Sequence, residues 1–233
     1  PYKIMKNVLL IGCGHMGSAL LASWLKSKDY QLTVIDSIKY KSLLNKFTNK
    51  KVKILKSISN LKNSSKYDFV VLAVRPVDLD KALVETSKIK FKNKTSIISV
   101  VAGKKIKIIK NKFKNLNNFF RIMPNIPALI GQSMNCVVSN KEANNLNKKE
   151  VIKLFSYSGK TILLKNEKQI DMSTAISGSG PGFIFNMIDA MEKSAIKLGF
   201  NKNISKILVS QTFKGSINLF LKNNSTAQDL VNT

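Results

Sequence analysis

The chain has few of the residues that build disulfide scaffolds and histidine-dependent active sites. Its 233 residues include only two cysteines, Cys13 and Cys136, and a single histidine, His15. Two cysteines so far apart make no disulfide framework, so we expect a reducing compartment, the cytoplasm. No apolar run approaches the roughly 18 residues that a membrane span needs, and we expect no signal peptide before the first predicted strand. The sequence therefore predicts no membrane partner, and we assign no metal site.

Acidic residues are also scarce: 13 stand against 39 lysines and arginines, for a net charge of +26. Such a balance raises the question of nucleic-acid binding. However, the lysines are spread over every segment, with many asparagines and isoleucines, which indicates a compositional bias rather than a patch. The densest run, Lys104–Lys114, places lysine between Ile and Phe at helical spacing, which is typical of a solvated helix face. We predict no specific nucleic-acid partner, and only non-specific binding at low salt.

The most informative segment is Gly12–Gly17, which reads GCGHMG. An apolar run at Val8–Ile11 precedes it and is typical of a buried strand, and Ser18–Leu25 follows with a helical pattern. A lone G-x-G-x-x-G is weak evidence, but between a strand and a helix it is the dinucleotide-binding fingerprint.

The three glycines of this segment have separate expected roles. Gly12 allows the tight turn, Gly14 lets a pyrophosphate approach the backbone, and Gly17 lets the helix pack close to the strand. The free N–H groups and the dipole of the following helix favour an anion there. Asp36 ends the second predicted strand about 20 residues later, where an acid normally binds the ribose hydroxyls.

Strands and helices alternate along the first part of the chain. Strands are predicted at residues 5–11, 32–35, 52–55, 69–74, 96–101, 119–122 and 161–164. Helices are predicted at residues 15–28, 39–47, 78–90, between Gly103 and about Lys112, and at 151–157. This alternation predicts an α/β fold, a Rossmann-like, doubly wound parallel sheet.

The pattern changes after about residue 166, where no further strand is predicted. Two long helices are predicted, at 181–199 and 203–222, with Pro181 suited to a first turn and Gly199 to a stop. Their apolar faces are wide for a small core, which favours packing against a second subunit. We therefore divide the chain into a dinucleotide-binding domain, 1–166, and an all-helical C-terminal dimerisation and substrate domain, 167–233.

Four further segments resemble one family in order and spacing. They are LAVRP at 72–76, SVVAG at 99–103, RIMPNIPA at 121–128 and TAISGSGPG at 174–182. From about residue 5 to its end, the chain resembles pyrroline-5-carboxylate reductase. The resemblance implies that NADPH or NADH delivers hydride to the C=N carbon of 1-pyrroline-5-carboxylate, giving L-proline. It also implies a homodimer or a larger homo-oligomer.

The residues are compatible with that reaction. A protonated imine is already a good hydride acceptor, so the site needs close placement of donor and acceptor rather than a strong general base. We assign no catalytic residue, and His15 is expected to be a filler position of the phosphate loop. A β-hydroxyacid dehydrogenase-like enzyme is the nearest alternative. That family has a catalytic lysine a few residues after its Gly-rich segment, whereas here no lysine follows Gly180 until Lys193. A non-catalytic cofactor-sensing module is the other alternative.

The resemblance also implies which residues form the site. The cofactor-binding residues would be Ile11, Gly12, Cys13, Gly14, His15, Met16, Gly17, Asp36, Ala73, Val74, Arg75, Pro76, Val100, Val101, Ala102, Met123 and Asn125. The substrate pocket would be bordered by Thr174, Ser177, Gly178, Ser179, Gly180 and Pro181, of which the last three also suit a helix cap. For Arg75 a phosphate contact and a solvated side chain are equally expected, whereas for Arg121 we favour an internal salt bridge.

The choice of nicotinamide cofactor depends on opposing charges. Asp36 disfavours a 2′-phosphate, while Lys39 and Lys41 follow closely and offset it. We expect NADH to be preferred and NADPH to work as well.

The sequence ends at Asp229–Thr233, the point where the family continues into a Ser-Pro-Gly-Gly-Thr-Thr loop near the substrate. We therefore expect the domain to be truncated at its C-terminus, and the 233-residue chain to bind cofactor but to reduce the imine poorly.

Overall fold

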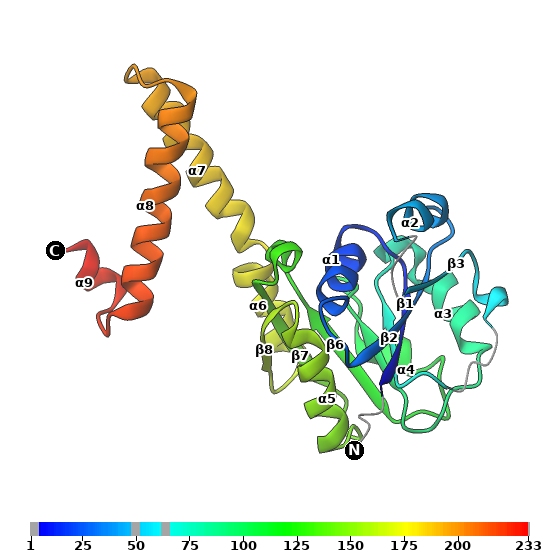
Figure 1. The fold of residues 1–233 in the computed structure, drawn as a ribbon. Coiled ribbons are helices and arrows are strands. Elements are labelled where there is room, and N and C mark those ends of the chain that lie inside the picture. The colour runs from blue at the N-terminus through cyan, green and yellow to red at the C-terminus, as the bar shows by residue number, and fades with distance from the viewer. Residues whose placement is uncertain (1–4, 48–51, 62–65, 233) are drawn as a thin grey trace. The chain divides into compact units, whose positions relative to one another are not determined.

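The computed structural model describes residues 5–47, 52–61 and 66–232, which form two compact units, Pro1–Ser179 and Gly180–Thr233. The first unit is built on one eight-stranded sheet in the order β3-β2-β1-β4-β5-β6-β7-β8 (Figure 1). Its strands are β1 Lys6–Ile11, β2 Tyr30–Ile35, β3 Val52–Leu55, β4 Phe69–Leu72, β5 Ser96–Ser99, β6 Asn118–Met123, β7 Ser133–Ser139 and β8 Gly159–Leu163. Its α-helices are α1 His15–Trp24, α2 Tyr40–Lys46, α3 Leu79–Ser87, α4 Ile106–Lys110, α5 Asn145–Ser156 and α6 Glu167–Ser173.

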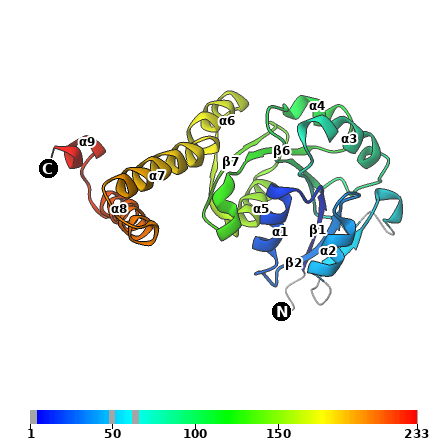
Figure 2. The same cartoon turned by 90° about the horizontal axis from the view of Figure 1, so that it is seen from above.

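Helices cover both faces of this sheet, as predicted. Helices α1, α2 and α5 lie on one face, and α3 and α4 on the other (Figure 2). Strand side chains alternate between the two cores: Val8 and Leu10 pack with α1 and α5, and Leu9 and Ile11 with α3 and α4. Trp24 is fully buried in the first core, where its Nε1–H donates to the carbonyl of Leu154 at 2.9 Å.

The sheet is parallel, as predicted, except at one edge that the sequence pattern did not reveal. Strand β7, which the sequence pattern missed, runs antiparallel to β6, and β8 is parallel to β7. Only a short 3₁₀ helix, η4 (Ile126–Ile130), separates β6 from β7, and a short connection returns the chain in the opposite direction because a parallel pair needs a longer crossover.

Several predicted boundaries are also corrected. The predicted strands 69–74 and 96–101 end earlier, at Leu72 and Ser99, and beyond them the N–H groups of Ala73 and Val100 make one more bond each to a neighbouring strand. The predicted helix 15–28 ends at Trp24, where Lys26 and Ser27 make i→i−3 bonds of a tighter turn. The helix predicted over residues 151–157 begins at Asn145, because the side chain of Asn144 accepts the N–H of Asn147 as a cap.

The second unit is helical, as predicted, with α7 at Gly180–Lys197 and α8 at Lys202–Lys222. A short helix that the sequence did not predict, α9 (Ala227–Val231), follows and is started by a capping box between Thr226 and Asp229. Within the described residues, no helix is long and apolar enough to cross a membrane.

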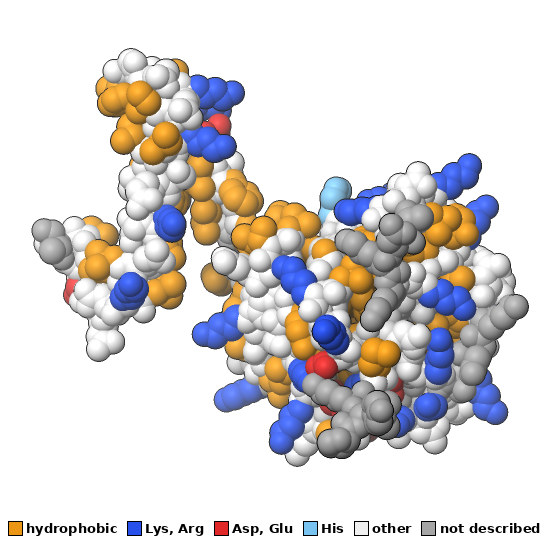
Figure 3. Space-filling model, viewed as in Figure 1, with side chains coloured by type: hydrophobic (Ala, Val, Ile, Leu, Met, Phe, Trp, Pro, Cys, Tyr) orange, Lys and Arg blue, Asp and Glu red, His pale blue; other side chains and the backbone are white. Residues whose placement is uncertain are grey.

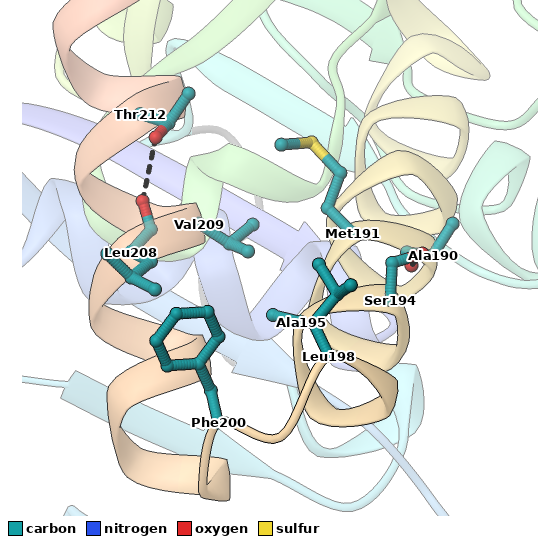
Figure 4. A pocket seen from close by; sticks show the side chains of 9 residues that line it. All are labelled: Ala190, Met191, Ser194, Ala195, Leu198, Phe200, Leu208, Val209 and Thr212. Carbon is teal, nitrogen blue, oxygen red and sulfur yellow. Dashed lines mark hydrogen bonds between the residues drawn. The ribbon is translucent and has the colours of Figure 1, made fainter.

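An apolar groove of about 400 Å³ lies between α7 and α8 (Figure 4). Its only hydroxyls, Ser194 and Thr212, donate to the carbonyls of Ala190 and Leu208 in their own helices. With those hydroxyls occupied and no charged side chain in its lining, the groove is a packing surface rather than a place for chemistry.

Candidate functional site

The loop between β1 and α1 leaves open space at one glycine and none at the other two. Gly12 has φ +88°, and a Cβ there would stand 2.8 Å from the backbone of Ala73. A Cβ on Gly17 would stand 2.4 Å from the carbonyl oxygen of Gly12, whereas one on Gly14 would meet nothing within 4 Å. Gly14 is the N-cap residue of α1 and has no side chain that could cap the helix. The loop is therefore a cradle that a side chain at Gly14 would fill, and it suits a diphosphate.

Asp36 holds this loop in place from the end of β2. Its Oδ2 accepts the N–H of Cys13 at 2.7 Å, and its Oδ1 accepts the N–H groups of Ile38 and Lys39 at 3.0 and 2.7 Å. The carboxylate that we expected to bind the ribose hydroxyls thus also joins the glycine loop to the chain after β2.

Cys13 is buried within the loop rather than presented to a ligand. Its Sγ lies 3.4 Å from Oγ of Ser18, and Oγ of Ser18 donates to the carbonyl of Cys13 at 2.9 Å. Burial raises the pKa of the Cys13 thiol above its ordinary value, with the hydrogen bond to Ser18 opposing part of the rise. The thiol is therefore held in its neutral form.

The candidate cofactor residues gather at the carboxyl ends of neighbouring parallel strands. Strands β2, β1, β4, β5 and β6 are adjacent, and the chain order reverses between β1 and β4. The residues after β4 and β5 extend this edge, because the N–H of Ala73 bonds to Ile11 and that of Val100 to Leu72. Open α/β sheets bind ligands outside such a switch point.

The predicted site residues differ in their exposure. His15, Arg75, Pro76, Ala102 and Ser179 are exposed; Gly14, Met16, Asp36, Ala73, Val74, Met123, Thr174, Ser177, Gly178 and Gly180 are half-buried; and Ile11, Gly12, Cys13, Gly17, Val100, Val101, Asn125 and Pro181 are buried. All of them except Gly180 and Pro181, which begin α7, belong to the first unit.

The two arginines have different surroundings. Arg75 is exposed, and its Nε donates to Asp78 at 2.7 Å. Arg121 is buried and makes the internal salt bridge that we favoured, with Glu167 at 3.4 Å and Asp171 at 2.6 Å. The two acids stand four residues apart on α6, which is the only sequence signal that could have identified them as partners.

The segment after α6 has a conformation that sequence reasoning missed. Thr174–Gly178 form a π-helix, and the N–H of Ser179 donates to the carbonyl of Thr174 at 2.8 Å. π-helices are rare in proteins, and those that occur are often found at functional sites. Asn125, at the N-cap of η4, donates through Nδ2 to the carbonyl of Ser177 at 2.8 Å, which ties this turn to the end of β6.

Two known protein families match parts of this chain. Residues 7–103 match an NADP oxidoreductase family described as coenzyme F420-dependent, and residues 167–233 match the pyrroline-5-carboxylate reductase dimerisation family. A pyrroline-5-carboxylate reductase from Synechocystis is 30% identical over 212 residues, covering 90% of this chain and 77% of that protein. The chain belongs to the pyrroline-5-carboxylate reductase family.

Other relatives of this family match over similar lengths. The pyrroline-5-carboxylate reductase of Haemophilus influenzae is 28% identical, with 94% of this chain and 79% of that protein covered. A crystal structure of the Plasmodium falciparum enzyme with NADP bound has a TM-score of 0.84 and 28% identity, covering 99% of this chain and 84% of that one. The resemblance in the four sequence segments is thus confirmed over nearly the whole chain, including the sheet unit and the helical unit.

Proposed function

We propose that this chain reduces the C=N bond of 1-pyrroline-5-carboxylate to give L-proline, with NADPH or NADH as the reductant. The observation that carries the proposal is the open cradle at Gly14, at the switch point of a chain that belongs to a reductase family. Hydride transfer to a protonated imine needs no strong base, and the single histidine, His15, is exposed at the start of α1. When bound, the reduced nicotinamide supplies the hydride.

The residues divide into a cofactor side and a substrate side. On the cofactor side, the N–H groups at the start of α1 would bind the diphosphate, and Val100 and Val101 would give an apolar wall. On the substrate side, Thr174 and Ser177 belong to the π-helix, but their hydroxyls donate to the carbonyls of Ile170 and Ser173. These side chains would therefore shape the pocket more than they would donate to the substrate, and hydroxyl oxygens remain able to accept.

Two measurements test this proposal: the rate of imine reduction and the affinity for the cofactor. We expect the purified chain to bind NADPH or NADH, seen by nicotinamide fluorescence, and to oxidise it slowly, and only when 1-pyrroline-5-carboxylate is present. The reverse assay, L-proline with NAD⁺ or NADP⁺, should produce reduced cofactor. Tight cofactor binding with no turnover in either direction would favour the cofactor-sensing alternative instead. Absence of cofactor binding would overturn the proposal itself.

For the choice between cofactors, we propose that NADH is preferred and that NADPH is accepted. The negative charge of Asp36 disfavours a 2′-phosphate, and Lys39 offers a compensating positive charge. Substituting Lys39 with alanine leaves its backbone N–H to Asp36 intact. We expect K39A to raise the KM for NADPH several-fold and that for NADH by less than twofold. Equal effects on both cofactors, or a strong NADPH preference in the parent chain, would contradict this.

For the assembly, we propose a homodimer or a larger homo-oligomer that forms through the helical unit. Helices α7 and α8 expose large apolar side chains in the isolated chain, among them Phe183, Phe185, Met187, Ile217 and Leu221. An apolar surface of this extent favours association, and the match to a dimerisation family over 167–233 supports a second copy as the partner.

For the compartment, we propose the reducing cytoplasm. Both cysteines, Cys13 and Cys136, are buried free thiols, as is usual for proteins that need no disulfide.

A further inference from the structure

The end of β6 contacts the segment 167–178 at three alternating residues. Side chains two residues apart point to the same face of a strand, and Arg121, Met123 and Asn125 follow that spacing. Arg121 pairs with Glu167 and Asp171 in α6. Asn125, whose backbone is still extended, reaches the carbonyl of Ser177. One stretch of chain thus contacts successive turns of α6 and the π-helix.

Met123 makes the middle contact. A Cβ added at Gly178 would stand 3.1 Å from the Cε methyl of Met123 and 3.2 Å from Cγ2 of Thr174. The π-helix therefore packs tightly against the end of β6, and Gly178 leaves room for the methionine.

The amide of Asn125 is oriented by its own surroundings. Its Oδ1 accepts the N–H of Met134 at 2.9 Å and the hydroxyl of Ser133 at 3.1 Å. Its backbone N–H donates to Oγ of Ser133 at 3.0 Å. Because both acceptor positions are filled from β7, Nδ2 is fixed on the side of the π-helix, where it donates to Ser177 at 2.8 Å. The residue itself is buried, with 9% of its surface exposed.

We propose that Asn125 is a positioning residue for the imine pocket, acting through the carbonyl of Ser177 to hold the π-helix Thr174–Gly178 at the end of β6. This inference rests on the proposed function, since it takes the π-helix as the border of the substrate pocket. It gives Asn125 a role other than the cofactor contact that the resemblance implies. The π turn departs from the hydrogen-bond pattern of an α-helix, and the Asn125 amide holds one of its carbonyls from outside. Asn125 supplies that donor from a strand end that is itself fixed in the sheet.

The test compares N125D with the parent chain. The substitution keeps the acceptor for Met134 but replaces the Nδ2 donor by an oxygen facing the carbonyl of Ser177. We expect hydrogen exchange of the peptide covering 174–179 to become at least tenfold faster. We also expect the KM for the imine to rise at least tenfold, while the dissociation constant of NADPH or NADH, measured by fluorescence, changes less than twofold.

Acidification gives a readout that general damage to the fold would not reproduce. A protonated carboxyl group can donate to the carbonyl of Ser177; burial and the facing carbonyl oxygen favour this protonated form, while the hydrogen bonds from Met134 and Ser133 favour the carboxylate. We expect the ratio of variant to parent KM to fall as the pH is lowered from about 8 to about 6, together with recovered exchange protection at 174–179.

Two further variants serve as control and second probe. N115D makes the same chemical change at an exposed residue between α4 and β6, and should leave every readout unchanged. S133A removes the hydroxyl that orients the Asn125 amide, and should give a smaller shift in the same direction, so it replaces N125D if that variant does not fold.

The outcomes separate this inference from the proposed function. A weaker cofactor affinity in N125D with an unchanged imine KM would assign Asn125 to the cofactor and overturn the inference. Unchanged exchange at 174–179 would also overturn it. If the parent chain fails to reduce the imine, the proposed function fails, while the exchange measurement still decides whether Asn125 holds the π-helix.

Discussion

At the level of single residues, two glycines of the β1–α1 loop are needed for different reasons, one for stability and the other for ligand binding. Gly17 lies against the carbonyl of Gly12, so any side chain there must displace backbone. Gly14 has an ordinary negative φ of −65° and open space around its Cα. An alanine at Gly14 is therefore compatible with the folded chain but occupies the space where a diphosphate would lie.

This difference gives a paired prediction. We expect G14A to lower the unfolding free energy by no more than about 1 kcal/mol, because alanine is a poorer N-cap residue than glycine, and to raise the dissociation constant of the cofactor at least tenfold. We expect G17A to lower the unfolding free energy by about 1–3 kcal/mol or more, as overpacking does. Urea unfolding without ligand and a fluorescence titration measure the two effects. Unchanged cofactor affinity in G14A would remove the cradle as the binding site.

Cys13 gives a pH dependence with a definite sign. Burial raises the pKa of its thiol in the folded chain, while the unfolded thiol titrates near about 8.5. Above that pH the unfolded state loses its proton first, so stability is fully present below about 8.5 and declines as the pH rises toward the folded pKa, by at most about 1.4 kcal/mol per pH unit.

The pKa values of Tyr30 and Tyr67 are raised by burial as well, and these groups contribute only above about 10. Urea unfolding at pH values between about 8 and 9.5, compared with C13A, isolates the cysteine. A decline of equal slope in both proteins would exclude Cys13 as its cause.

The sequence located the glycine loop and indicated a salt bridge for Arg121, but it did not identify the residues that contact them. The apolar run before Gly12 and the spacing of the three glycines were sufficient to locate the loop, because a motif of that kind depends on local backbone conformation. The internal salt bridge of Arg121 was predicted without Glu167 or Asp171, since those acids reach it only through tertiary packing. The same limit applies to Asn125, whose hydrogen bonds come from β7 and the π-helix.

At the level of elements, the anchoring of α6 depends on one buried arginine. The side chain of Arg121 is 5% exposed, while those of Glu167 and Asp171 are 28% and 52% exposed. Glu167 also accepts the N–H of Ile106 at the start of α4, so the same carboxylate joins β6, α6 and α4. Removing the arginine leaves acids that water can still reach, which limits the penalty.

We therefore expect R121Q to lower the unfolding free energy by about 1–3 kcal/mol, less than the 3–5 kcal/mol of a fully buried broken pair. R75Q is the matched control, because its pair with Asp78 is exposed and should change stability by less than about 0.5 kcal/mol. Urea unfolding of both variants measures this, and equal effects would show that burial of Arg121 contributes nothing.

The burial pattern of each element explains whether it could be predicted from the sequence. Strands β1 and β4 contain buried apolar runs, Val8–Ile11 and Phe69–Leu72, and β5 is buried throughout with Ile97 and Ile98 at its centre. Strand β7 was missed because Ser133 and Asn135, although buried, interrupt its pattern with polar side chains. The π-helix was unpredictable for a different reason: its sequence suits an ordinary helix start, and its shape depends on contacts from β6.

At the level of the whole molecule, basic charge and apolar surface are distributed differently. On the face shown in Figure 3, lysines and arginines are scattered over the first unit without forming one patch. Large exposed apolar side chains recur instead along α7 and α8. The high net charge therefore favours solubility and weak, salt-dependent contacts, while specific association is expected through the helices.

The last prediction concerns that association. Phe183 is 64% exposed on α7, and Leu146 is 65% exposed at the start of α5 in the first unit. F183D and L146D place the same charge at equally exposed apolar sites. A difference between their effects on assembly therefore shows which of the two sites lies in the interface. We expect F183D to lower the molecular mass measured by light scattering at micromolar concentration, and to make the melting temperature independent of protein concentration, because assembly stabilises by mass action. L146D should assemble like the parent chain. Equal masses for all three proteins would place the interface away from Phe183.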